Sequence, residues 1–216
     1  MESYIYCLHR MKEELTRLQR ERKIPERLTG VRIVTTLDGE SQMAAHYLVR
    51  RELSHRSMQL EGYQKSSATA PEPVLRVEEL GFYNVQVEDV FIKGEQSRIQ
   101  VTFGNGKEAH VNYQGILRAV EAYLQHKEKG IWARATKKDV EECLKNIHKD
   151  DIILVSVKKA NDEILADLEQ PAAMQSAYVS LQPDGRIKAI VGSNTNRDFN
   201  QRWFRLGFGN SSWRPP

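Results

Sequence analysis

The feature that most constrains the fold is a series of short stretches in which apolar and polar residues alternate between turn sequences. An alternation with a period of two is typical of half-buried β-strands. The predicted strands comprise residues 83–92, 98–103, 108–111, 152–157, 163–168, 174–181 and 186–191. Gly104, Asn105 and Gly106 favour a tight hairpin between the second and third strands, and residues 183–185 favour a turn between the last two. Several short strands with regular turns predict a small barrel, of which the oligonucleotide/oligosaccharide-binding (OB) type is one common form.

Apolar residues at helical spacing interrupt this pattern. Amphipathic helices are predicted for residues 4–18, 39–53, 114–125 and 139–147. Asp38 is the expected N-cap of the second helix, and Val31, Ile33 and Val34 predict a short strand before it. Residues 64–74 read QKSSATAPEPV, which has no apolar periodicity and predicts a linker and a domain boundary. The chain is therefore expected to adopt an α+β fold, mainly β.

Charge and composition exclude several classes of function. The 32 basic and 29 acidic residues give a net charge of +3, a near-balance that creates no strong field for polyanions, so no nucleic-acid partner is expected. Cys7 and Cys143 are predicted to be free, and the six histidines lack metal-ligand spacing. No cofactor and no metal are expected. The sequence contains neither a membrane segment nor a signal peptide, which predicts a cytoplasmic location if the chain is made alone.

The C-terminal stretch GNSSWRPP carries the candidate chemistry. Ser211 stands three residues before Arg214, a spacing at which a helical turn brings a hydroxyl and a basic group together. A deprotonated amine in that place can accept the serine proton, whereas a guanidinium keeps its own proton in proteins. Ser211 is therefore a degenerate nucleophile position, and Arg214 is expected to be inactive as a base.

Three stretches together resemble the central region of class A, bifunctional penicillin-binding proteins, which polymerise and crosslink peptidoglycan. They are residues 30–49 (GVRIVTTLDGESQMAAHYLV), residues 150–157 together with 168–200, and residues 209–216. The resemblance implies a connector helix and loop at 1–29 and a first transpeptidase segment with linker at 30–74. It further implies an OB-like insertion at 75–170 and a second transpeptidase segment at 171–216, truncated at a Ser-x-x-Lys-like motif.

The departures from the family pattern bear on activity. Arg214 replaces the family's lysine, Ser193 replaces a glycine, and no Ser-x-Asn or Lys-Thr-Gly string occurs. Aligning on Gly209 instead of Trp213 moves Asn210 to the nucleophile position. The resemblance therefore implies a noncatalytic fragment of a peptidoglycan synthase, not an enzyme as it stands. Its OB-like module is expected to contact periplasmic regulatory proteins or glycan, since the family is anchored in the inner membrane and faces the periplasm.

Two alternatives remain open. The first is a free-standing OB-like protein that binds single-stranded nucleic acid or oligosaccharide, which needs aromatic side chains beside cations on the strand faces. Its candidate residues are Tyr83, Phe91, Phe103, Lys93, Arg98 and Lys107. The second is an active serine acyltransferase, which the arginine at 214 argues against.

Overall fold

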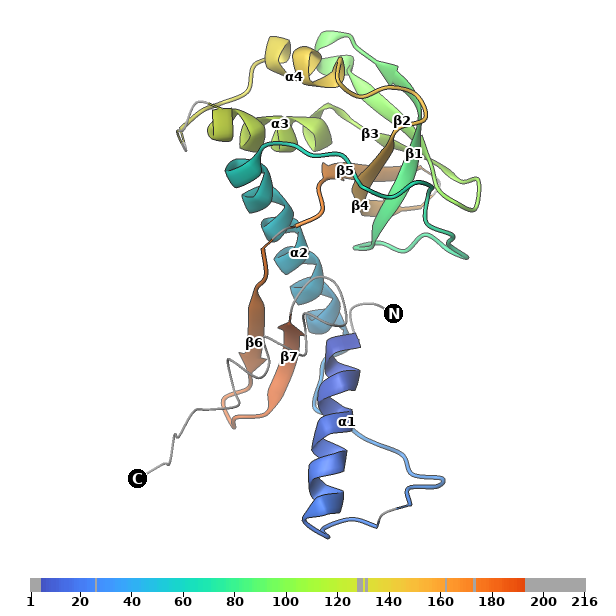
Figure 1. Cartoon of the computed structure of the whole chain (residues 1–216), viewed down its shortest axis with the longest axis vertical. Helices are drawn as coiled ribbons and strands as arrows, with labels where there is room; N and C mark the ends of the chain where they lie inside the picture. Colours follow the sequence, from blue (N-terminus) through green and yellow to red (C-terminus); the bar gives the residue numbers. More distant parts are fainter. Residues whose placement is uncertain are drawn as a thin grey trace. The chain divides into compact units, whose positions relative to one another are not determined.

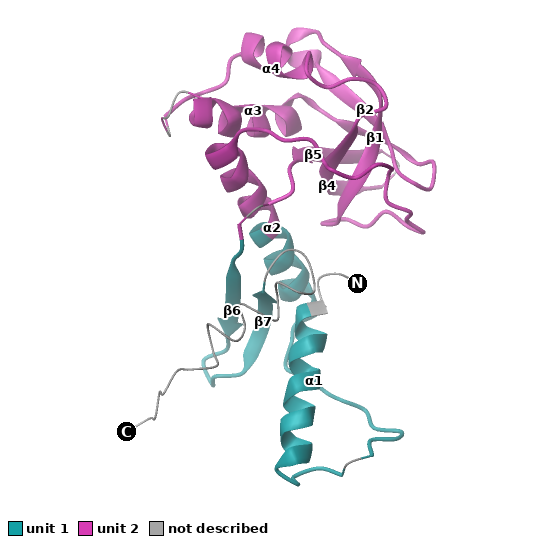
Figure 2. Cartoon of the chain, viewed as in Figure 1, with its two compact units in different colours: residues 1–49, 175–216 teal, residues 50–174 magenta. Residues whose placement is uncertain are grey.

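The computed structural model describes residues 5–25, 27–127, 130, 132–161, 163–172 and 174–192 (Figure 1). The helices are α1 (Ile5–Arg20), α2 (Gly39–Glu61), the short 3-10 helix η2 (Gly94–Gln96), α3 (Tyr113–Lys127) and α4 (Lys137–Leu144). The strands are β1 (Phe82–Phe91), β2 (Arg98–Thr102), β3 (Glu108–Val111), β4 (Ile152–Ala160), β5 (Ile164–Glu169), β6 (Ala177–Leu181) and β7 (Ile187–Gly192). The chain divides into two compact units, residues 1–49 with 175–216 (unit 1) and residues 50–174 (unit 2), so that α2 contributes to both (Figure 2).

Unit 2 is built on a closed barrel with the strand order β1-β2-β3-β5-β4. β1 pairs with both β2 and β4, and every neighbouring pair is antiparallel except β3 with β5. α3 and α4 lie in the connection between β3 and β4 (Figure 1). A five-stranded barrel of this order is the arrangement of the OB fold. The prediction of an α+β fold with a small barrel is confirmed, but the fold is not mainly β, because the helices contain more residues than the strands.

The strand register explains the barrel core. Ile99 lies opposite Val111 and Val101 lies opposite Ala109, and all four side chains point into the barrel, where they are buried. Ile116 of α3 packs on the same core. Complete burial of a valine or isoleucine side chain stabilises a fold by roughly 1.5–3 kcal/mol relative to its exposure. The alternation seen in the sequence therefore divides each strand into an apolar inner face and a polar outer face.

The second helix is longer than the sequence analysis predicted. Asp38 caps it as expected, because its Oδ2 accepts a hydrogen bond from the Ser41 amide at 3.0 Å. The helix continues past residue 53 to Glu61, and Met58 is buried in the core of unit 2. It ends where Gly62 adopts a φ of +77°, a left-handed conformation that glycine adopts without strain. The prediction of an end near residue 53 is wrong because tertiary burial extends the helix by two turns.

The strand predicted for Val31, Ile33 and Val34 is not formed. These three side chains are exposed, and residues 31–38 make no strand ladder. A strand needs a partner for its backbone groups. The contacts of this segment with β7 are a hydrogen bond from Thr36 Oγ1 to the Ile187 carbonyl (2.7 Å) and one from the Asp38 amide to the Lys188 carbonyl (2.9 Å).

The stretch predicted as a linker, residues 64–74, lies against the barrel. The Glu72 amide donates to the Asn84 carbonyl at 3.0 Å, and Ser66 Oγ donates to Asn84 Oδ1 at 2.6 Å. A Cβ atom added to Gly104 would lie 2.3 Å from the Glu72 carbonyl oxygen, so the β2–β3 turn also packs tightly on this stretch. Unit 2, to which this stretch belongs, begins within α2, at residue 50.

A buried group of charges attaches α2 and α3 to the outer side of β4 and β5. Arg118 of α3 pairs with Glu169, whose Oε1 also accepts a hydrogen bond from Ser156 Oγ at 2.9 Å. Arg51 of α2 lies 3.3 Å from Asp167 Oδ2, and the Lys158 ammonium lies 2.8 Å from Asp167 Oδ1. Both carboxylates are buried, which makes their cations necessary to the packing of the helices.

In unit 1, the hairpin β6–β7 packs against the first half of α2 through Ala189 and Val191 of β7 and Ala45 of the helix. The buried Gln42 side chain both donates to the Ile190 carbonyl and accepts from the Ile190 amide, each at 2.9 Å. A side-chain amide thereby satisfies backbone groups of β7 that a neighbouring strand would otherwise satisfy. Within the described ranges, none of the helices is long and apolar enough to cross a bilayer.

Candidate functional site

The polar outer side of β1, β2 and β3 is the candidate binding surface. Its side chains alternate with the buried ones, and the register sets them in three rows across the strands. The first row pairs Phe91 with Arg98; the second aligns Asp89, Gln100 and His110; the third aligns Gln86, Thr102 and Glu108. These eight residues are called the outer barrel face below. In OB barrels the corresponding strands carry oligonucleotide and oligosaccharide ligands.

One end of the outer barrel face is aromatic. The Phe91 side chain is 40% exposed, and the Arg98 guanidinium lies over its ring, 5.1 Å from the centroid. A cation over a ring holds both groups in place at modest energetic gain. The pair therefore presents a flat, partly apolar surface beside the polar rows.

The remaining rows offer hydrogen-bonding groups of both kinds. Gln100 Nε2 donates to Glu108 Oε2 at 3.1 Å, and Gln86 Nε2 donates to Asp150 Oδ1 at 2.8 Å. His110 Nδ1 is inaccessible to solvent and has no hydrogen-bond partner among the described residues, so this atom is not itself presented to a ligand. An amide also keeps a free acceptor oxygen when its nitrogen is engaged. The outer barrel face is thus equipped to bind a ligand rich in hydroxyl and amide groups.

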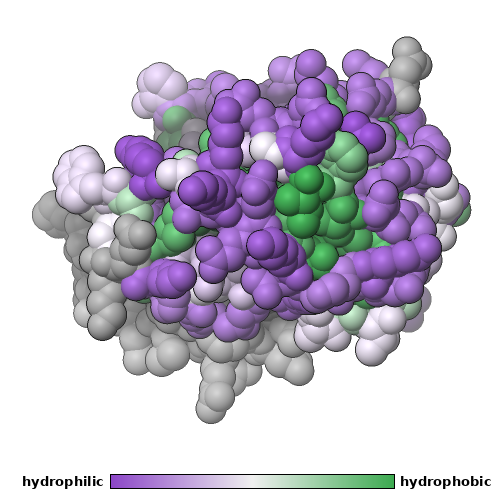
Figure 3. Space-filling model, turned by 90° about the horizontal axis from the view of Figure 1, so that it is seen from above, coloured by the Kyte–Doolittle hydropathy of each residue, from purple (hydrophilic) through white to green (hydrophobic). Residues whose placement is uncertain are grey.

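The charges of the outer barrel face disfavour binding of a nucleic acid through its phosphate backbone. Apart from His110, the face carries one cation, Arg98, against two carboxylates, Asp89 and Glu108. Single-stranded nucleic acid requires a groove of positive charge along its backbone. Figure 3 shows a coloured surface that is mostly hydrophilic around one hydrophobic patch. The geometry therefore fits a neutral, polyhydroxylated ligand better than a polyanion.

The structure separates the predicted aromatic residues. Phe91 and Arg98 are brought together on the outer barrel face, but Phe103 is buried in the core. Tyr83 packs on Phe103 edge to face, with centroids 5.4 Å apart, and its hydroxyl accepts a hydrogen bond from the Glu78 amide at 3.0 Å. A stacking surface of three aromatic rings is therefore absent from these strands.

Two cations proposed beside the rings lie in the connections. Lys93 follows β1 and Lys107 lies in the β2–β3 turn, and both are exposed. Ser211 and Arg214, the candidate nucleophile and the arginine in place of the base, lie outside the described residues. In the part of the chain that the structure describes, no three His, Cys, Asp or Glu side chains gather as a metal site would require.

The sequence analysis did not single out Gln100 and His110. The signal was present, since each alternates with core residues of its strand, Gln100 with Ile99 and Val101, and His110 with Ala109 and Val111. Only the register across the strands shows that the two side chains are neighbours. No protein-family model matches this chain, and no curated protein matches it either.

Proposed function

We propose that unit 2 is a glycan-contact module, and that the chain is a noncatalytic part of a peptidoglycan synthase related to the class A penicillin-binding proteins. The observation that carries the proposal is the outer barrel face, with its exposed Phe91–Arg98 pair and its adjoining amide, imidazole, hydroxyl and carboxylate groups. Sugar rings offer an apolar face and many hydroxyl groups, which suit an aromatic ring beside mixed donors and acceptors.

The position of the barrel in the chain supports the family part of the proposal. The chain leaves unit 1 within α2, forms unit 2 over residues 50–174, and returns to unit 1 as the β6–β7 hairpin. Such an insertion agrees in order with the resemblance, in which an OB-like domain interrupts the transpeptidase segments. We place the module on the periplasmic side of the membrane, where the glycan of that family is assembled.

A titration of the full chain with soluble peptidoglycan strands of alternating N-acetylglucosamine and N-acetylmuramic acid tests the proposal. We expect shifts of the amide NMR signals of β1, β2 and β3, and weaker binding by Gln100→Ala and His110→Ala. Glu142→Ala on α4 is the matched control and is expected to bind as the parent does. Loss of a single good hydrogen bond corresponds to a roughly five- to tenfold weaker affinity.

Two outcomes would reject the glycan module. One is an absence of signal shifts up to millimolar glycan. The other is binding that the Gln100 and His110 substitutions leave unchanged while Glu142→Ala weakens it. Binding of a periplasmic regulatory protein through the same strands without glycan binding would assign the face to protein docking instead.

The nucleic-acid alternative has one observation in its favour, the exposed Phe91 ring with Arg98 over it. A titration with a single-stranded oligonucleotide at low salt separates the two ligands, because phosphate contacts strengthen as salt falls. We expect no binding. Tight, salt-sensitive binding that Arg98→Ala abolishes would favour the alternative.

A further inference from the structure

The strand β6 of unit 1 has a free edge. Counting only the described residues, β6 pairs with β7 alone, and the two strands form a sheet of their own (Figure 1). Tyr178, Val179 and Leu181 of β6 are 44%, 47% and 60% exposed. The edge of a sheet presents backbone N–H and C=O groups that can pair with another strand. β6 is therefore a candidate docking surface.

The hydrogen bonds of the hairpin show which backbone groups of β6 point to this edge. The amide and carbonyl of Ile190 in β7 are both bonded to the Gln42 side chain of α2, so they point away from β6. Opposing residues of an antiparallel pair exchange both bonds or neither, and Val179 lies opposite Ile190. The amide and carbonyl of Val179 therefore point to the free edge. The Gln182 amide, three residues on, donates to the Arg186 carbonyl at 2.7 Å and so points inward, as the alternation requires.

β6 lacks the features that protect most edge strands from pairing. Edge strands ordinarily carry a lysine, a proline or a bulge. The strand Ala177–Leu181 reads AYVSL, which contains neither a charge nor a proline. The irregularity of the hairpin lies in β7, where Lys188 is the extra residue between the partners of Ser180 and Leu181. The outer edge of β6 is thus a regular strand that a further strand can follow.

We propose that two copies of the chain associate through β6, with the two strands antiparallel and a two-fold axis at Val179. Because the backbone groups of Val179 face the edge in both copies, the two Val179 residues exchange a pair of hydrogen bonds. The same register sets Ala177 opposite Leu181 of the second copy, and Tyr178 opposite Ser180 of the second copy. A small side chain thus meets a large one, and a tyrosine meets a serine.

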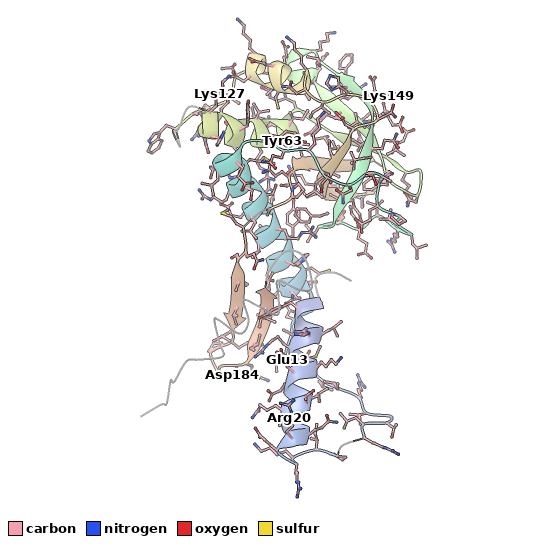
Figure 4. All side chains as sticks on the ribbon, in the orientation of Figure 1. Glu13, Arg20, Tyr63, Lys127, Lys149 and Asp184 are labelled. Atoms are coloured by element: carbon pink, nitrogen blue, oxygen red, sulfur yellow. The ribbon has the colours of Figure 1, made fainter. Side chains whose placement is uncertain are left out.

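Symmetry and charge favour a second copy as the occupant. In a two-fold contact a residue near the axis meets its own counterpart, so a charge there would repel itself, and β6 has none. The nearest charges along the chain, Asp184 in the turn (Figure 4) and Arg186, pair with each other at 2.6 Å within one copy. A two-stranded sheet is also marginal by itself, and pairing through β6 makes one sheet of four strands.

Sedimentation velocity of the full chain over a range of concentrations tests the association. We expect the mass to rise from the 24.9 kDa of one chain toward twice that value. Val179→Pro removes the N–H that faces the edge and no hydrogen bond to β7, so the hairpin should tolerate it. It removes one bond from each copy, and we expect roughly 25-fold weaker association, about fivefold for each bond.

A second pair of variants tests the same contact through charge. Val179→Lys places two like charges opposite each other at the axis and should also prevent association. Val34→Lys is the matched control, because Val34 is 82% exposed in unit 1 and lies outside the hairpin. It should associate as the parent does. Since both side chains are exposed, these two substitutions should leave the circular dichroism spectrum unchanged.

Cross-linking tests the register. The Cα atoms of the two Val179 residues should lie about 5.5 Å apart, within the reach of a disulfide. Val179→Cys, oxidised with copper–phenanthroline, should therefore give a covalent dimer on a non-reducing gel. Ser180→Cys is the control for register, because the two Ser180 residues are offset by two positions and should lie about 8 Å apart, beyond that reach. The parent chain under the same oxidation shows what Cys7 and Cys143 contribute.

Several results would overturn the inference. These are a monomer at all concentrations up to about 1 mM, a dimer that Val179→Lys leaves intact, and equal cross-linking of Val179→Cys and Ser180→Cys. Hydrogen exchange gives a further test at concentrations where the chain is monomeric. Protection of the Val179 amide under those conditions would assign the edge to the chain's own residues and would also reject the dimer, whereas rapid exchange that slows on association is the expected result.

Discussion

The buried pair between Arg118 and Glu169 gives the sharpest prediction about stability. Glu169 is fully buried and the Arg118 side chain is only 20% exposed, so the guanidinium is the main compensation for a carboxylate withdrawn from water. The substitution Arg118→Met retains an unbranched apolar side chain and removes the charge. Breaking a buried pair in this way costs about 3–5 kcal/mol of unfolding free energy, because the remaining charge stays buried. We expect that loss at pH 7.

The pH dependence distinguishes this cause from a loss of packing. Burial raises the pKa of Glu169 above its ordinary value of 4.5, and the attraction of Arg118 opposes that rise. A carboxyl whose pKa is raised in the folded state binds more protons when the protein is folded than when it is unfolded. Its contribution to stability therefore falls as the pH rises from the unfolded-state pKa through the folded-state pKa. Removing Arg118 removes this opposition, so the folded-state pKa of Glu169 rises further and the pH range over which stability falls becomes wider. The destabilisation by Arg118→Met should therefore shrink to about 1–2 kcal/mol below pH 4.5, where the carboxyl is protonated in both states.

Urea unfolding of the full-length variants, followed through the amide NMR signals of β4 and β5, measures both effects. Arg56→Met is the matched control, because Arg56 pairs with Glu52 at 2.8 Å on the exposed side of α2. An exposed pair contributes at most about 1 kcal/mol. A loss for Arg118→Met no larger than for the control, or a loss that does not change with pH, would refute the reasoning.

The remaining predictions concern the hairpin, the barrel turn and the serine. Gln42→Leu should cost about 2–4 kcal/mol, since it leaves the buried amide and carbonyl of Ile190 unpaired, and faster hydrogen exchange in β7 would show it; unchanged exchange would argue against the role of Gln42. Gly104→Ala should destabilise unit 2, because its Cβ would meet the Glu72 carbonyl at 2.3 Å, and a melting temperature equal to that of the parent would contradict this. Ser211 should not be labelled by a fluorescent β-lactam, and stoichiometric labelling seen on a denaturing gel would disprove the noncatalytic proposal.

Local patterns were sufficient to predict most of the barrel. The alternation along residues 83–92 and 98–103 predicted β1 and β2 to within one residue at each end, and the glycines at 104 and 106 predicted the turn after them. These signals are strong because a strand with one buried face repeats every two residues, and because a tight turn needs particular backbone angles. Both are properties of consecutive residues, so the sequence displays them directly.

Long-range contacts decided the rest. Nothing local to residues 31–34 shows that their β-branched side chains lack a partner strand, and nothing local to residues 54–61 shows that Met58 is buried in the core of unit 2. The candidate binding face also depends on a long-range contact, because Gln100 and His110 are ten residues apart and become neighbours only through the β2–β3 register. A sequence determines which face each side chain occupies, whereas the pairing of strands determines which side chains meet there.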